Sequence, residues 1–150
     1  MISSRRNLMI AGAAGLALAS VPRSADAKSM SHAEKENLKL VTDFVKGWEA
    51  KHYDAEKEFS DYVAPDASIR MEEDKPAMQR EGAAKQMKGF YTGGGNLEVK
   101  IHETFARGPV VVNTRTDTVT MPGKGAQDYK VCGVFVVKGK IVEWTDYLIA

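Results

Sequence analysis

The spacing of apolar residues changes once along the chain, and this change limits the folds that the chain can adopt. In three segments of the first 91 residues, 38–48, 54–63 and 83–91, apolar side chains recur with the spacing of one helix face. From residue 97 onward they alternate with polar residues, as in strands with one buried face. Helices and strands do not alternate, so a parallel sheet with crossover helices is disfavoured. We expect an α+β fold with a mostly antiparallel sheet folded over a helix-lined apolar pocket.

Three helices are predicted, with one short strand between the second and the third. The first helix begins with a capping box, because Glu34 follows Ser31 by three positions. A second, short helix begins at Asp54, and a third covers residues 83–91. The buried face of the first helix is formed by Leu38, Val41, Phe44, Val45 and Trp48.

The second half of the chain is predicted to be β-structure. Residues 138–140 read as a tight turn between the last two strands. Strict alternation places Phe105 on the buried face of its strand, and it places Val142 on the same face as Trp144. Pro65 separates the second helix from the first strand. The five predicted strands cover residues 67–71, 97–105, 110–121, 129–137 and 141–148.

Composition excludes several classes of function. The chain has 150 residues, enough for one domain, and a formal charge of +1, which gives no electrostatic case for binding nucleic acid. The single cysteine, Cys132, excludes an internal disulfide and a multi-cysteine zinc site. Its position between Val131 and Gly133 indicates a small core residue. The three histidines are scattered, so we expect them at the surface, and we expect neither a metal nor a cofactor.

The first 27 residues have the organisation of a bacterial export signal. Arg5-Arg6 precedes an apolar run over residues 8–21, which is too short to span a bilayer and has no polar face, unlike an amphipathic helix. Ala25-Asp26-Ala27 supplies a cleavage pattern of small residues. The arginine pair resembles a twin-arginine signal, and the general secretory route is the alternative. We predict one domain over residues 28–150, periplasmic or exported, with no stable membrane insertion after signal removal.

Three ionisable residues occupy strand positions that should face the core. Arg115 and Asp117 are two residues apart and share an apolar strand face, and Asp146 lies on the apolar face of the last strand. Buried charges need partners, and one arginine can serve two carboxylates. Two such carboxyls can differ in protonation state, as general acid–base catalysis requires. A buried ion network that only joins two strands is the alternative.

Two segments carry a more specific signal: Arg115-Thr116-Asp117, and residues 133–147, which read GVFVVKGKIVEWTDY. Together they resemble the limonene-1,2-epoxide hydrolase family, and the resemblance extends over about residues 34–148. That family shares a cone-shaped α+β fold with nuclear transport factor 2, ketosteroid isomerase and SnoaL-like cyclases. The resemblance therefore implies a curved sheet around a pocket and, by analogy, a homodimer.

The resemblance also implies roles for the three ionisable residues. Asp146 corresponds to the base that activates water, and Asp117 corresponds to the acid that protonates the epoxide oxygen. Arg115 corresponds to the arginine that bridges them. The implied reaction is a one-step addition of water to an epoxide.

The chain departs from the family on the first strand. A tyrosine and an asparagine that help to hold the water correspond here to Ile69 and Met71, which cannot hydrogen-bond in that way. This departure favours a non-catalytic periplasmic module that binds a small molecule or acts in assembly, whereas the intact triad favours an enzyme. In both cases we expect a small apolar ligand, and plain core packing is the alternative for its candidate pocket residues. These are Trp48, Ile69, Met71, Met87, Phe90, Met121 and Phe135.

Overall fold

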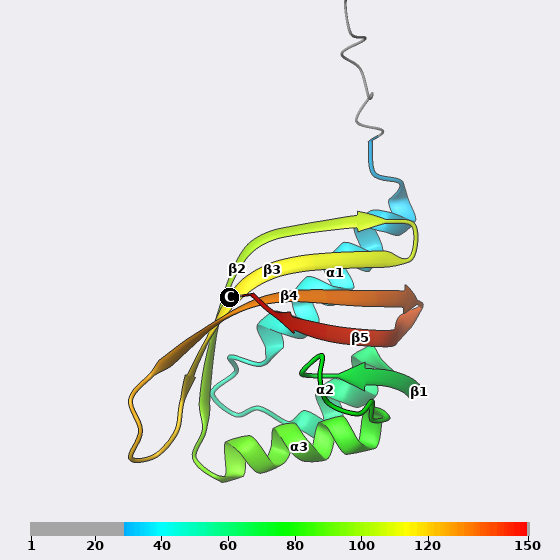
Figure 1. Ribbon diagram of the computed structural model, residues 1–150. Coiled ribbons are helices and arrows are strands. Elements are labelled where there is room, and N and C mark those ends of the chain that lie inside the picture. Colours follow the sequence, from blue (N-terminus) through cyan, green and yellow to red (C-terminus); the bar gives the residue numbers. More distant parts are fainter. Residues whose placement is uncertain (1–28, 150) are drawn as a thin grey trace, which may run out of the picture.

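The computed structural model describes residues 29–149, which form three helices and a five-stranded sheet (Figure 1). The predicted export signal, residues 1–27, lies outside the described residues. None of these three helices has the length and apolar character needed to cross a bilayer. In chain order the elements are α1 (His32–Gly47), α2 (Ala55–Tyr62), β1 (Val63–Arg70), α3 (Arg80–Thr92), β2 (Asn96–Arg107), β3 (Val110–Thr120), β4 (Gln127–Lys138) and β5 (Lys140–Leu148).

The sheet is curved and mixed, with the strand order β1-β5-β4-β3-β2. Three of its neighbouring pairs are antiparallel, and β1 pairs with β5 in parallel. The helices lie on one side of the curve, with α1 behind the sheet in Figure 1 and α3 across its lower end. The predicted α+β class with a mostly antiparallel sheet is therefore confirmed, and the parallel edge pair was not anticipated.

The start of α1 is fixed by the predicted capping box. Ser31 Oγ accepts from Glu34 N at 3.2 Å, and Glu34 Oε2 accepts from Ser31 N at 2.7 Å. The other oxygen of Glu34, Oε1, accepts from Gly108 N at 2.7 Å, in the turn between β2 and β3. One carboxylate thus begins the helix and joins it to the sheet.

The first strand begins earlier than predicted, at Val63, and it includes Pro65. Proline is tolerated because β1 is an edge strand, where a missing ladder donor does little harm. Ile69 exchanges two backbone hydrogen bonds with Met78, of 2.9 and 2.8 Å, so the chain loops out and returns between them. The strand therefore ends at Arg70, and Met71, which was predicted to lie in the strand, comes after it.

Two shifts in strand pairing exchange the faces of some side chains. In β2 the pairing shifts after Ile101, so Ala106 is buried and Phe105 is 53% exposed. In β5 a second shift places Ile141 in the core instead of Val142. The predictions that Phe105 and Val142 face the core are wrong, because one extra residue in a strand reverses the alternation beyond it.

An aromatic cluster fills the core between α1, α2 and the inner face of the sheet. The ring of Phe44 lies edge-on to Trp144, with centroids 5.7 Å apart, and Trp144 stacks on Trp48 at 5.3 Å and on Phe135 at 5.7 Å. Cys132 was predicted to be a small core residue, but it lies half-buried on the outer face of β4. Its two chain neighbours take the inward positions instead, which corrects that prediction.

Candidate active site

Asp117, Arg115 and Asp146 meet on the inner face of the sheet. Arg115 Nε donates to both carboxylate oxygens of Asp117, at 2.9 and 3.0 Å, and Arg115 Nη2 donates to Asp146 Oδ2 at 2.6 Å. Arg115 is 1% exposed, Asp117 9% and Asp146 6%. The structure therefore brings together, in one buried network, the three ionisable residues that the sequence singled out.

The three central strands hold this network in place. Arg115 and Asp117 belong to β3 and Asp146 belongs to β5, so the guanidinium has to cross β4. Gly133 lies on β4 directly opposite Asp146. A Cβ atom at Gly133 would lie 2.6 Å from Arg115 Nη1 and 3.0 Å from Asp146 Oδ1. The glycine thus leaves the space through which the arginine reaches both carboxylates.

Sequence analysis missed the hydrogen-bonding roles of two further residues. Asn113 Oδ1 accepts from Arg115 Nη1 at 3.1 Å, and Trp144 Nε1 donates to Asp146 Oδ1 at 2.7 Å. Asn113 lies two positions before Arg115, and Trp144 lies two positions before Asp146. Each pair therefore shares a strand face, and this spacing could have identified both residues from the sequence. The ring of Trp48 covers the guanidinium from α1, with Arg115 Cζ 5.2 Å from the ring centroid.

The surroundings of the network bias its protonation states. Burial raises the pKa of the Asp117 carboxyl above its ordinary value; the charge and hydrogen bonds of Arg115 oppose this rise, and the nearby Asp146 adds to it. For Arg115, burial acts to lower the pKa, but the charges of Asp146 and Asp117 and their hydrogen bonds outweigh it and raise the pKa. Asp117 is thus a carboxyl that retains its proton more readily than usual, beside a permanent cation.

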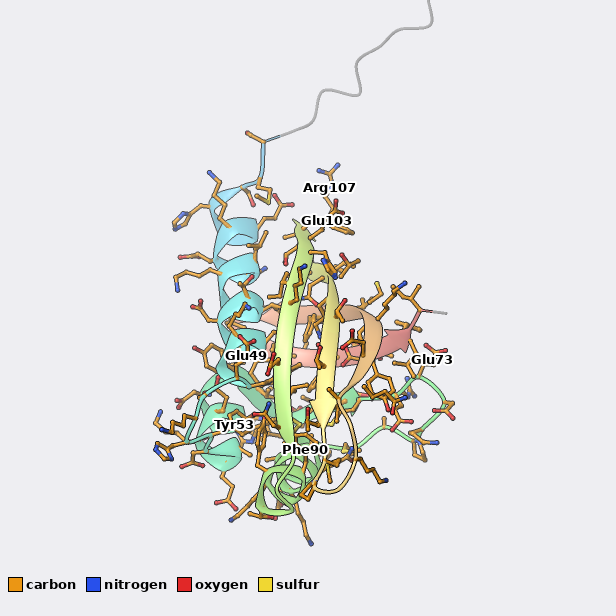
Figure 2. All side chains as sticks on the ribbon, turned by 90° about the vertical axis from the view of Figure 1, so that its left-hand side faces the viewer. Glu49, Tyr53, Glu73, Phe90, Glu103 and Arg107 are labelled. Carbon is orange, nitrogen blue, oxygen red and sulfur yellow. The ribbon has the colours of Figure 1, made fainter. Side chains whose placement is uncertain are left out.

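A cavity of about 400 Å³ opens beside the network, and Asp117 is the member of the network that lines it. Four of the predicted pocket residues line this cavity: Trp48, Met71, Met87 and Phe90. Figure 2 shows Phe90 at the α3 end of the molecule, away from Glu103 and Arg107. Three others do not line it, since Ile69 and Phe135 are fully buried elsewhere in the core and Met121 follows the end of β3. Sequence analysis missed the strand residues Leu97, Val119, Val131, Trp144 and Leu148, and the polar residues Glu72, Gln86 and Tyr129.

The described residues contain no cluster of three or more histidine, cysteine, aspartate or glutamate side chains that could hold a metal. His32, His52 and His102 are exposed, as predicted. His102 Nε2 lies 2.8 Å from Thr116 Oγ1 on the outer face of the sheet, away from the cavity. The polar groups of the buried network are two carboxyls, a guanidinium, an amide and an indole.

The sequence model of the limonene-1,2-epoxide hydrolase catalytic domain matches residues 35–150 of this chain. Among solved structures, an LEH-like epoxide hydrolase of M. tuberculosis is 24% identical, with a TM-score of 0.67 over 78% of this chain and 85% of that chain. A protein named as a SnoaL-like polyketide cyclase from Jannaschia sp. CCS1 is 17% identical, with a TM-score of 0.68 over 81% of this chain and 90% of that chain. No curated protein matches the chain.

These findings agree on architecture, and the match to the sequence model shows the family. The structural neighbours share the SnoaL-like, nuclear transport factor 2-like fold, which is the curved sheet with three helices described above. The sequence match covers α1 through β5 almost completely, including every residue of the buried network. The chain belongs to the limonene-1,2-epoxide hydrolase family.

Proposed function

We propose that this protein is an epoxide hydrolase-like enzyme that adds water to a small apolar epoxide by general acid–base catalysis. The observation that carries this proposal is the buried Asp117–Arg115–Asp146 bridge, of which one end, Asp117, lines an apolar cavity. A carboxyl with a raised pKa in an apolar cavity is suited to donate a proton to a departing oxygen. Burial also strengthens the effect of the neighbouring cation on the reacting groups.

The reaction takes place in one step with complementary roles for the carboxyls. Asp146 accepts a proton from water as the water oxygen bonds to one epoxide carbon. The bond from that carbon to the ring oxygen breaks, and the ring oxygen takes the proton of Asp117, which gives a diol. Arg115 holds both carboxyls and balances the negative charge that passes from one to the other. Proton exchange with water then resets the pair.

Incubation of the purified mature protein with terpene and aryl epoxides in ¹⁸O-labelled water tests this function. We expect one labelled oxygen in each diol, and a loss of turnover of about 10²-fold or more in both Asp146→Asn and Asp117→Asn. Lys85→Glu, on the exposed face of α3, is the control and should leave the turnover unchanged. Absence of diol with every epoxide, or wild-type turnover by Asp146→Asn, would exclude the hydrolase.

A second candidate function is a non-catalytic binding module, and Ile69 and Met71 favour it. Ile69 is fully buried and Met71 contributes only a thioether to the cavity, so β1 gives Asp146 no polar neighbour from these two positions. In this case the ion network serves only to stabilise the floor of the cavity. Native mass spectrometry of the protein from the periplasm should then show a retained apolar molecule. An empty cavity under gentle conditions would count against this candidate.

We also infer that the protein is exported and acts in the periplasm or outside the cell. The support is the sequence of residues 1–27, with Arg5-Arg6, the apolar run and the small-residue cleavage pattern. Amino-terminal sequencing of the periplasmic protein should begin at Lys28. Replacement of Arg5-Arg6 by two lysines should block export by the twin-arginine route, whereas unchanged export would indicate the general secretory route.

A further inference from the structure

The side-chain amide of Asn113 has one unused donor in the interior of the protein. Asn113 is 0% exposed, and its Oδ1 is engaged by Arg115 Nη1 at 3.1 Å. Its Nδ2 has no acceptor among the described residues. Buried donors in folded proteins are nearly always paired, with protein atoms or with ordered water, so this nitrogen needs an acceptor.

The position of Asn113 in the sheet relates it directly to Asp146. Asn113 pairs with Gly133 across β3 and β4, and Gly133 pairs with Asp146 across β4 and β5, so the three residues form one row. The middle residue of the row has no side chain. Asn113 and Asp146 also bind the two terminal nitrogens of the same guanidinium, Nη1 and Nη2. The amide and the carboxylate therefore approach the arginine from the two ends of a row whose middle, over Gly133, is occupied by the guanidinium itself.

The other flank of Asp146 is apolar. Ile69 pairs with Trp144 across β1 and β5, Arg70 pairs with Thr145, and Met71 follows Arg70 just after the end of β1. Met71 lines the cavity but cannot donate a hydrogen bond. Of the residues in this row, Asn113 is thus the one that carries an amide.

A water molecule can form hydrogen bonds with both Asn113 and Asp146, the two residues that flank Gly133 in this row. It accepts a hydrogen bond from an amide N–H and donates one to a carboxylate, whose oxygens each have room for a second hydrogen bond. We propose that Asn113 Nδ2 holds a buried water molecule against Asp146, and that this is the water that Asp146 deprotonates. The second part of this proposal rests on the proposed hydrolase function, and the first part does not.

The chemical role of Asn113 follows from the two lone pairs of water. One lone pair accepts the N–H of Asn113, one O–H bond points to Asp146, and the second lone pair is free to bond to an epoxide carbon. The amide itself neither gains nor loses a proton, so Asn113 is a positioning residue. Ile69 and Met71 cannot form a hydrogen bond to this water. The amide of Asn113, on β3, would hold it instead.

A high-resolution crystal structure of the wild-type protein tests the water site without any variant. We expect an ordered water within hydrogen-bond distance of both Asn113 Nδ2 and a carboxylate oxygen of Asp146. The same site should be dry in Asn113→Leu, which keeps the branched shape and the number of side-chain heavy atoms but removes the amide. If no water contacts Nδ2 in the wild-type crystal, the proposal is overturned, whatever the protein does to epoxides.

Kinetics test the role of this water. Asn113→Leu and Asn113→Ser should each lower kcat for an epoxide by about 10²-fold, because misplacement of a reacting group by about 1 Å has an effect of this size. KM should change less than about twofold, and so should the affinity for the unreactive alkene that corresponds to the epoxide. A simple loss of structure would not lower kcat while leaving KM and this affinity nearly unchanged. Thr42→Val removes another buried unpaired polar atom, on α1, and should leave kcat unchanged.

The two proposals fail in different ways. Wild-type kcat in both Asn113 variants, with diol still formed, would overturn the role of Asn113 and leave the hydrolase in place. If the wild-type protein makes no diol, the hydrolase fails, and the water between Asn113 and Asp146 is then supported or overturned by the crystal structure alone. If Asn113→Leu does not fold, the kcat of Asn113→Ser tests the role of the water, and the wild-type crystal structure tests the water site.

Discussion

Arg115 uses all three of its guanidinium nitrogens inside the protein. Nε binds Asp117, Nη1 binds Asn113 and Nη2 binds Asp146, while the ring of Trp48 covers one face of the group. A planar group with a fixed fork of donors can make these contacts together, and a lysine ammonium cannot. The site therefore depends on this side chain more than on either carboxyl.

Arg115→Met should destabilise the protein by about 3–5 kcal/mol at neutral pH, because two buried carboxylates lose their cation. The loss should be smaller at acid pH, where protonation removes the unpaired charges. Urea unfolding at the two pH values measures the difference. An equal loss at both would contradict the ion network as the cause.

Gly133→Ala should be destabilising by about 1–3 kcal/mol, because the added methyl collides with a guanidinium and a carboxylate that hold each other in place. Catalytic turnover should fall with it, since Arg115 and Asp146 have to separate. Gly125→Ala is the control: no atom lies within 4 Å of a Cβ placed there, and its stability should stay within about 0.5 kcal/mol of wild type. Thermal and urea unfolding measure both variants.

The raised pKa of Asp117 gives a pH dependence of definite sign. As a general acid Asp117 has to be protonated, so the turnover of an epoxide should fall as the pH rises through the raised pKa of this carboxyl. Its contribution to stability has the same sign, since a group that binds its proton more tightly in the folded state stabilises below that pKa and less above it. In Asp117→Asn, the decrease with rising pH should disappear from the pH profiles of kcat/KM and of the free energy of unfolding. A turnover that rises with pH over this range would assign Asp117 the opposite role.

At the scale of single elements, Glu34 links α1 to the turn between β2 and β3. Its hydrogen bonds from the backbone of Gly108 and of Ser31 lower the pKa of the Glu34 carboxyl. A lowered pKa means that the contribution to stability is complete above the ordinary glutamate pKa and is lost as the pH falls through the lowered value.

Glu34→Gln should therefore lower Tm at neutral pH, and the difference from wild type should shrink in acid. Ser31→Ala, which removes only one of the capping hydrogen bonds, should lower Tm less than Glu34→Ala. Thermal unfolding followed by circular dichroism at several pH values measures these effects. A larger effect of Ser31→Ala would show that the contact with Gly108 contributes little.

Local patterns in the sequence predicted most elements, because caps and alternation depend on neighbours in the chain. The capping box located α1, and alternation placed Arg115, Asp117 and Asp146 on inward faces. Features that depend on pairing between strands were not predictable in this way. The shifts that expose Phe105 and the parallel pairing of β1 both arise from contacts distant in the sequence. The inward face of Asn113 was predictable, and its missing partner was not.

At the scale of the whole molecule, the outer face of the sheet carries a row of three apolar residues that ends at a threonine. Phe105, Val112, Val134 and Thr145 are neighbours across β2, β3, β4 and β5, and Phe105 is 53% exposed. Tyr147, on the same face near the end of β5, is 45% exposed. We propose that this face joins two copies of the chain in a homodimer.

Sedimentation velocity should give the mass of a dimer for the wild-type protein. Val134→Glu should give a monomer, because it places a charge in the middle of the apolar row. Lys85→Glu on α3, on the helical side of the molecule, is the matched control and should stay dimeric. A wild-type monomer at all concentrations tested would contradict the proposed interface.

The groups proposed for chemistry and three of the apolar groups that line the cavity belong to different parts of the fold. Arg115, Asp117 and Asp146 sit on central strands, whereas Met71, Met87 and Phe90 come from the loop after β1 and from α3. Central strands are held on both sides by backbone ladders, and loops and surface helices open at lower cost. Exchange of side chains that line the cavity can therefore redirect the protein to new ligands without disrupting the buried ion network, which makes the scaffold well suited to diversification by evolution or by directed selection.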